Sequence, residues 1–170
     1  MLYQGKIDNS ACNKLYKLNL FEDIKYPKSK YFEDLDTTYK IFLKSDKIVA
    51  TNKKLYNYYQ RTGSILHKKN EKLCNDLYEI INSMEKKLNH YSVLKKAIIC
   101  RKINACFYIY RNSNNKILKE ECKKIVKLNR CNVLKDKNIN KKTKYGLYLS
   151  YLGMNIVNIV FKILKTLNIK

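Results

Sequence analysis

The sequence is poor in residues that interrupt regular structure. Its 170 residues contain 1 Pro, 4 Gly and no Trp. So few chain breakers argue against a sandwich of many short strands joined by tight turns, and they favour long helices. An apolar share of 45%, with 12% aromatic residues, can build one packed core and argues against wholesale disorder.

The sequence also has no uninterrupted apolar run long enough for a membrane span, which needs roughly 20 residues. The most apolar stretch, residues 145–167, is interrupted by Ser150, Asn155 and Asn158. The first residues have no apolar core of a signal peptide, so we expect a cytoplasmic chain. Six cysteines without a CxxC pair, none at zinc-finger spacing from a histidine, indicate reduced thiols.

Positive charge dominates the composition. The net charge is +22, yet only four of the 36 basic residues are Arg. Arg suits bidentate recognition of phosphates and base edges, whereas Lys is a hydrated point charge, so we expect no specific nucleic-acid binding. Residues 1–66 hold 12 basic against 7 acidic side chains, and residues 67–170 hold 24 against 7. This difference in net charge predicts two regions, 1–66 and 67–170.

The first region has mixed secondary-structure signals. Residues 31–44 carry acidic side chains at the front, Lys at the back and an apolar stripe, which predicts a helix. Residues 47–51 and 55–61 are rich in β-branched and aromatic residues and predict two strands, which can pair as a hairpin. Residues 17–22 predict a short helix before them.

The second region is predicted to be a basic helical extension. Apolar residues recur at steps of three and four over residues 70–90, and similar patterns cover 93–111 and 116–128. Residues 135–144 form a hydrophilic connector. The apolar stretch 145–167 then predicts core packing or contact with a membrane surface.

An ordered series of short motifs lies in the first region. It consists of SACNKLY at 10–16, LF at 20–21, YP at 26–27, KYFED at 30–34, TTYK at 37–40 and LYNYYQRTGSI at 55–65. In order and spacing this series resembles the second half of the catalytic domain of bacterial family 2 glycosyltransferases. The resemblance covers about residues 7–66.

The resemblance implies an α+β, helix-rich fold class, with a partial GT-A (nucleotide-diphospho-sugar transferase-like) domain at 1–66 and the helical extension at 67–170. In this family a Rossmann-like half with the DxD metal motif precedes this point. The Asp34-Leu35-Asp36 sequence is not that motif, because it lies inside a helical pattern. We therefore expect a fragment, a remnant or one part of a split enzyme, inactive alone. The Mg²⁺ or Mn²⁺ of the parent enzyme would be held mainly by residues outside it.

The resemblance also assigns residues to the chemistry. Inverting glycosyl transfer needs a base to take the proton of the acceptor hydroxyl, and the resemblance gives that role to Asp34, with Glu33 supporting it. Acidic residues at a helix start can also simply satisfy free backbone N–H groups, and that alternative stays open. Replacing Asp34 by Asn distinguishes the two.

Further site residues are expected on the donor side. The Gln60-Arg61-Thr62-Gly63-Ser64 turn can present a guanidinium and N–H groups to a diphosphate, which makes Gln60, Arg61 and Ser64 substrate-binding candidates. An ordinary strand end with a solvated Arg is the alternative. By resemblance, Lys14 faces the nucleotide side of the cleft. His67 can complete the metal site with the DxD motif, and a lone surface histidine that binds no metal is the alternative.

The expected partners are a nucleoside diphosphate sugar and a glycan or lipid-linked acceptor in cell-surface polysaccharide synthesis. The basic region is expected to dock on the anionic inner face of the plasma membrane. Two other functions stay open. One is a non-catalytic module whose helices bind another protein, and the other is a basic nucleic-acid binder, which would lose affinity steeply with added salt.

Overall fold

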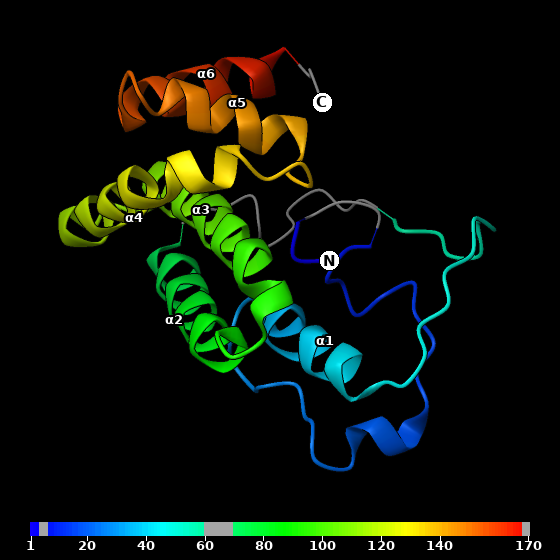
Figure 1. The fold of residues 1–170 in the computed structure, drawn as a ribbon. Coiled ribbons are helices and arrows are strands. Elements are labelled where there is room, and N and C mark those ends of the chain that lie inside the picture. Colours follow the sequence, from blue (N-terminus) through cyan, green and yellow to red (C-terminus); the bar gives the residue numbers. More distant parts are fainter. Residues whose placement is uncertain (4–6, 60–69, 168–170) are drawn as a thin grey trace.

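The computed structural model describes residues 1–3, 7–59 and 70–167. These residues form six α-helices and two short 3-10 helices (Figure 1). In chain order they are η1 (Leu18–Phe21), α1 (Glu33–Lys44), α2 (Glu71–Leu88), η3 (Ser92–Leu94), α3 (Lys95–Asn112), α4 (Lys116–Leu134), α5 (Lys141–Leu149) and α6 (Met154–Thr166). The predicted helices over 17–22, 31–44, 70–90 and 93–111 are confirmed within a few residues at each end.

Asparagine starts three of the helices. The side-chain oxygens of Asn70, Asn115 and Asn140 accept a backbone N–H from the first turn of α2, α4 and α5, at 2.9, 3.2 and 2.8 Å. The first turn of a helix has no intrahelical partner for its N–H groups, so each cap fixes where its helix begins. The abundant Asn of this sequence therefore places helix starts in the basic region.

Helix α3 lies at the centre of the molecule. It packs against α2 on one side and α4 on the other, and α5 and α6 lie across it (Figure 1). Ile98, Ile103 and Ile109 of α3 are at most 1% exposed. One hydrophobic cluster runs from Leu35 and Tyr39 of α1 through α2, α3 and α4 to α6.

The amino-terminal residues pack on the distant helices. The Tyr3 hydroxyl donates to Asp136 just after α4, and the Asn140 side chain donates to the Tyr3 carbonyl at 3.1 Å. The predicted boundary at 66/67 lies among residues outside the described ones and stays a prediction. The core contains side chains from both sides of it.

The prediction of strands at 47–51 and 55–61 is wrong for the residues that the structure describes. Residues 47–59 are irregular, and no strand occurs in 1–3, 7–59 or 70–167. Val49, Leu55 and Tyr59 are 78%, 76% and 83% exposed. A two-stranded hairpin is marginal in water without another strand or a helix to cover one face, and these side chains have no such cover. The described fold is therefore helical rather than α+β.

The carboxyl-terminal helices also differ from expectation. Helix α4 runs six residues beyond the predicted end at 128, and α5 begins inside the predicted connector, where Asn140 caps it. The apolar stretch 145–167 divides at a turn, where Gly153 has φ +115°. That left-handed backbone favours glycine and ends the helical run. Within the described residues, no helix is long and apolar enough to cross a membrane.

Candidate functional site

The loop before α1 holds the helix start in a fixed place. Phe32 has a left-handed backbone with φ 57°, which is uncommon for a bulky residue, and its ring packs edge-on against Tyr108 of α3 with centroids 5.8 Å apart. The preceding N–H of Tyr31 donates to the buried Asp76 carboxylate of α2 at 2.9 Å. These contacts fix the direction in which the first turn of α1 presents its acidic side chains.

Asp76 is the main polar anchor of this loop. Burial raises its pKa, but hydrogen bonds from Lys72 and the Tyr31 N–H outweigh burial and bring the pKa below 3.8. A lowered folded-state pKa stabilises the fold above the unfolded pKa, and that stability is lost as pH falls through the folded pKa. We expect Asp76→Ala to destabilise the chain by about 1–3 kcal/mol in urea unfolding at neutral pH, and by less in acid. A constant difference at all pH values would contradict this role.

The three acidic residues in the first turn of α1 have different surroundings. Asp36 forms an ion pair with Lys40, one turn on, at 3.1 Å. Glu33 is exposed. Asp34 is half-buried and forms no ion pair within the described part of the chain. One of its oxygens accepts the N–H of Leu35 at 2.6 Å, as the free N–H groups of a helix start allow.

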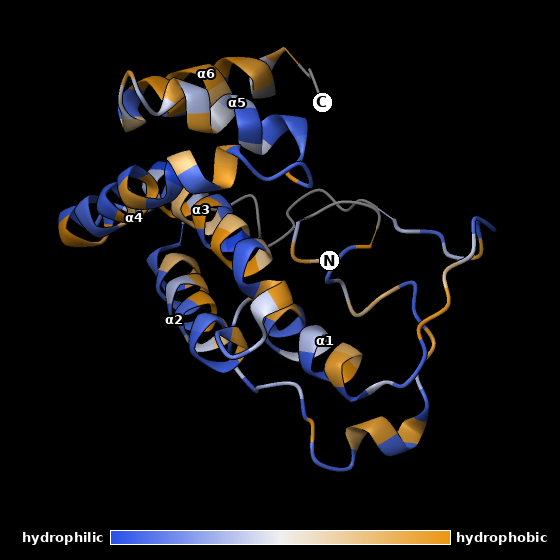
Figure 2. Ribbon diagram, viewed as in Figure 1, coloured by the Kyte–Doolittle hydropathy of each residue, from blue (hydrophilic) through white to orange (hydrophobic). Residues whose placement is uncertain are grey.

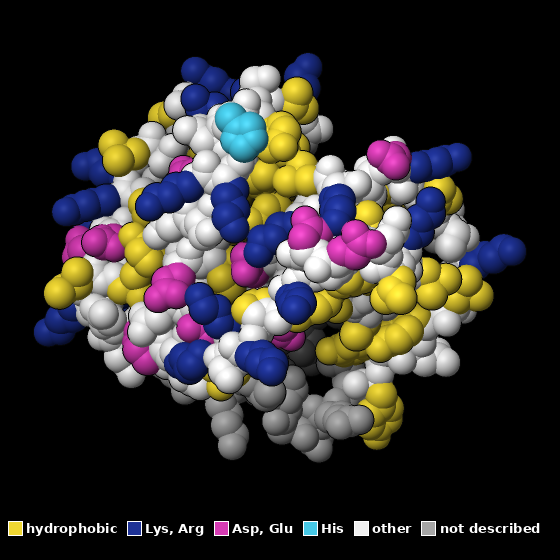
Figure 3. All heavy atoms as spheres, turned by 90° about the horizontal axis from the view of Figure 1, so that it is seen from below, with side chains coloured by type: hydrophobic (Ala, Val, Ile, Leu, Met, Phe, Trp, Pro, Cys, Tyr) yellow, Lys and Arg dark blue, Asp and Glu magenta, His cyan; other side chains and the backbone are white. Residues whose placement is uncertain are grey.

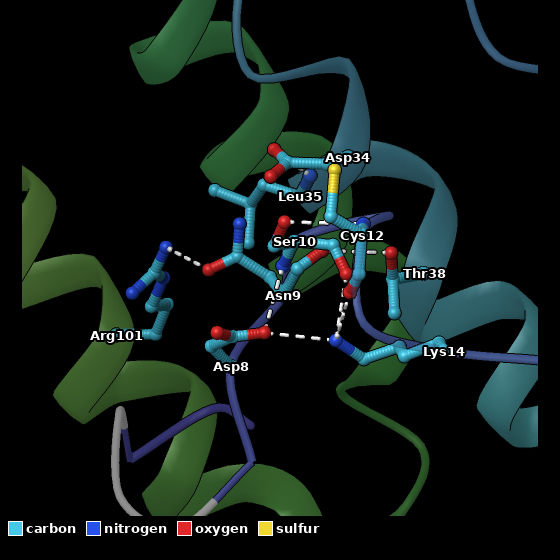
Figure 4. Close-up of polar contacts among 9 residues, drawn as sticks. All are labelled: Asp8, Asn9, Ser10, Cys12, Lys14, Asp34, Leu35, Thr38 and Arg101. Carbon is cyan, nitrogen blue, oxygen red and sulfur yellow. Dashed lines mark hydrogen bonds and ion pairs between the residues drawn. The ribbon is translucent and has the colours of Figure 1, made fainter. Parts of the chain in front are cut away.

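Asp34 lies beside a polar cluster built from distant parts of the sequence (Figure 4). Asn9 connects α1 to α3, because its backbone oxygen accepts the Thr38 hydroxyl at 2.8 Å and its side-chain oxygen accepts Arg101 Nη2 at 3.2 Å. Arg101 is 7% exposed, and among the described residues its Nη1 has no hydrogen-bond partner. The basic region thus contributes a buried guanidinium to the surroundings of Asp34.

The cluster shifts the ionisation of both charged groups. Burial raises the pKa of Asp34 above 3.8, and the negative charge of Glu33 adds to this, while the Leu35 N–H, the Asn9 side chain and Arg101 act in the opposite direction. Burial lowers the pKa of Arg101, and Asp34 opposes that change. A half-buried carboxylate with a raised pKa is a stronger base than an exposed one, which suits proton transfer.

The other predicted site residues divide into two groups. Lys14 lies in the same cluster, where its Nζ donates to Asp8 at 2.8 Å and to the Ser10 carbonyl at 2.7 Å, so it closes the 8–14 loop on itself (Figure 4). Its substrate-binding role stays a prediction. Four predicted residues lie outside the described part of the chain, namely Gln60, Arg61, Ser64 and His67.

Sequence reasoning missed Asn9 and Arg101. Asn9 stands one residue before the motif series, and Arg101 belongs to a region treated only as a basic extension. Arg101 is one of four Arg among 32 Lys and lies in the apolar middle of a helical pattern. That position in the sequence could have identified it, because an Arg on the buried side of a helix is rare unless another group pairs with its charge.

Two surface features bear on ligand binding. A hollow of about 240 Å³ is lined by Ser29, Lys30, Tyr31 and Lys72, on the loop that precedes α1. Within residues 1–3, 7–59 and 70–167, no group of three or more His, Cys, Asp or Glu side chains could hold a metal ion. The described residues therefore do not fit a metal site.

Comparison with known proteins gives one informative relative. The chain is 37% identical over 73 residues to the glycosyltransferase GlyA of Streptococcus pneumoniae serotype 4 (strain ATCC BAA-334 / TIGR4). The chain is related to a glycosyltransferase. The matched stretch is 43% of this chain but 10% of the streptococcal protein, so the chain spans about a tenth of that relative's length. No family model and no solved structure matches.

Proposed function

We propose that this chain is the acceptor-side part of a family 2, GT-A glycosyltransferase, with Asp34 as the base that activates the acceptor. The supporting observation is a half-buried carboxylate, free of ion pairs among the described residues, at a fixed helix start in a chain related to a glycosyltransferase. The donor would be a nucleoside diphosphate sugar bound by a Rossmann-like part outside these 170 residues. Any Mg²⁺ or Mn²⁺ would belong to that part.

The reaction assigned to Asp34 is a single displacement with inversion. The Asp34 carboxylate takes the proton of an acceptor sugar hydroxyl, and that oxygen forms a bond to the anomeric carbon of the donor. The bond from the anomeric carbon to the diphosphate oxygen breaks, and the nucleoside diphosphate leaves with the electron pair. Asp34 then loses the proton to solvent. A raised pKa helps the first step as long as the group stays ionised at working pH.

Arg101 and Asn9 are proposed as positioning residues. Arg101 holds the Asn9 side chain, and Asn9 in turn holds Thr38 of α1, so the two residues fix the cluster beside Asp34. Arg101 also provides a positive charge that lowers the pKa of Asp34, against the larger effect of burial. Neither residue touches the reacting atoms in this proposal.

The irregular segment 47–59 is the proposed contact with the donor-binding part. Hydrophobic side chains gather on the side of the molecule where η1 and residues 47–59 lie (Figures 1 and 3). Within this segment, Ile48 and Tyr58 are 50% and 65% exposed. A segment with strand-forming composition and no covered face can add to the edge of a partner sheet. Hydrogen exchange of residues 47–59 should slow when the donor-binding part is present.

The test of the proposed function is a hybrid enzyme. In the hybrid, the streptococcal glycosyltransferase keeps everything before its matched segment, and the complete 170-residue chain replaces that segment and all residues after it. We expect transfer to the acceptor that the streptococcal protein uses, with the truncated streptococcal protein alone as the control. A folded hybrid that binds donor but transfers no faster than this truncated control would refute the acceptor-side role.

A further inference from the structure

Helix α6 has an apolar side that no described residue covers. Ile156, Ile159, Ile163 and Leu167 are 37%, 52%, 52% and 60% exposed, and their spacing of three and four residues places them along one side of the helix. The opposite side is already used in the core. Met154 and Val157 are buried there, and the Phe161 ring packs near Phe107 of α3 with centroids 6.1 Å apart.

The exposed stripe of Ile156, Ile159, Ile163 and Leu167 is therefore not needed to pack α6 on the core. A surface helix of a water-soluble domain has an apolar side toward the core and a polar side toward water. Along α6, polar residues occupy only a narrow strip that includes Asn155, Lys162 and Thr166. Figure 2 shows the helix hydrophobic over most of its length, whereas the neighbouring α5 is largely polar.

The charged residues that follow Asp136 in the sequence have a single sign. No Asp or Glu follows Asp136, while seven Lys lie between 137 and 170. The exposed lysines of α5 are Lys141, Lys142 and Lys144. The Lys142 ammonium lies 5.9 Å from the centre of the Phe161 ring, so positive charge stands at the core-facing edge of α6 rather than within the exposed stripe.

Exposed tyrosines accompany the lysines. Tyr145 and Tyr148 of α5 are 66% and 52% exposed. Tyrosine rings favour the boundary between lipid headgroups and acyl chains, because one end is apolar and the other is polar. An apolar stripe, nearby tyrosines and lysines without acidic neighbours are together typical of a helix that lies in a membrane surface.

We propose that α6 lies in the surface of an anionic lipid bilayer, with Ile156, Ile159, Ile163 and Leu167 among the acyl chains and the lysines of α5 on the headgroups. A second copy of the chain fits this surface less well, since two chains of net charge +22 repel each other. A protein partner also fits less well, because Lys is depleted at the cores of protein interfaces. The proposal is independent of the glycosyltransferase assignment.

Co-sedimentation of the complete chain with vesicles tests the proposal. We expect binding to phosphatidylcholine vesicles that contain about 30% phosphatidylglycerol to be at least about tenfold tighter than to phosphatidylcholine alone, and to weaken with added salt. The double variant Ile159→Ser/Ile163→Ser should bind the anionic vesicles at least about tenfold more weakly. The matched control is Ile117→Ser on α4, where an isoleucine that is 75% exposed should be replaced without effect.

A second measurement places the helix in the bilayer. The chain has no Trp but 15 Tyr, so Ile159→Trp and Ile117→Trp each introduce a single tryptophan, which is excited at wavelengths where tyrosine does not absorb. We expect the emission of Ile159→Trp to shift to shorter wavelength on anionic vesicles and to be quenched by brominated acyl chains, while Ile117→Trp stays unchanged. Equal binding to neutral and anionic vesicles, or an unchanged Ile159→Trp spectrum, would overturn the proposal. So would a lipid-free dimer that the double variant dissociates, because the stripe would then cover a second copy.

Discussion

Asp34→Asn in the hybrid enzyme is expected to lower kcat by about 10²–10⁴-fold, the usual contribution of a positioned general base. Asn has nearly the same shape and can still accept the Leu35 N–H, but it cannot hold a proton. Donor and acceptor binding should persist, since the substitution removes a step rather than a binding contact. Steady-state kinetics on both substrates, together with calorimetric acceptor binding, measure the two effects separately.

The fold should tolerate this substitution. Burial raises the folded-state pKa of Asp34, so the ionised group costs stability once the pH has risen through that pKa. A neutral Asn removes that cost, and the melting temperature at pH 7 should stay equal or rise. A large fall in melting temperature would mean that Asp34 serves the helix start rather than catalysis.

Asp36→Asn is the matched control within the same helical turn. Asp36 carries the same charge, but it is paired with Lys40. An exposed i,i+4 ion pair contributes about 0.3–0.5 kcal/mol, and this partly buried pair somewhat more, so the variant should retain its activity and most of its stability. Equal losses from Asp34→Asn and Asp36→Asn would indicate that the acidic turn acts only through its total charge.

Ile103→Ala is expected to have the largest effect on stability, about 2–5 kcal/mol. Ile103 is fully buried at the middle of α3, which packs against α2, α4, α5 and α6, and removal of its side chain leaves a cavity that these helices cannot close. A domain of this size is stable by about 5–15 kcal/mol, so the variant should unfold at a much lower urea concentration.

The control for this variant lies on the surface of α4. Ile117→Ala shortens the same residue type where it is 75% exposed, and it should change the free energy of unfolding by less than about 0.5 kcal/mol. If Ile103→Ala were equally mild, α3 would not be the centre of the core. Hydrogen exchange should agree, with the slowest amides in α3.

Much of the helical fold could be predicted from the sequence, because its signals are local. The apolar repeat of 70–90 and the acidic front of 31–44 predict α2 and α1 nearly in place. Local signals could not show in the same way whether residues 47–51 and 55–61 form strands. Their β-branched and aromatic residues express a preference that needs neighbouring strands, and the described residues provide none.

The candidate site shows the same division between local and long-range information. Asp34 was found from a motif and a helix start, both of which are local. Arg101 is 92 residues from Asn9 in sequence, and only packing of α3 against the amino-terminal segment brings them together. No spacing rule predicts such a pair. Lys14 differs from Arg101, because its partners Asp8 and Ser10 lie within the same short loop, residues 8–14.

The pH dependence of kcat/KM tests the central claim most directly, that Asp34 takes the acceptor proton while the charge of Arg101 lowers its pKa. The hybrid should lose activity as pH falls through the pKa of Asp34, which burial raises above 3.8. Arg101→Gln removes a nearby positive charge, so the acidic limb should move to higher pH in that variant. An acidic limb at the same pH in Arg101→Gln, or one that persists in the residual activity of Asp34→Asn, would contradict the account.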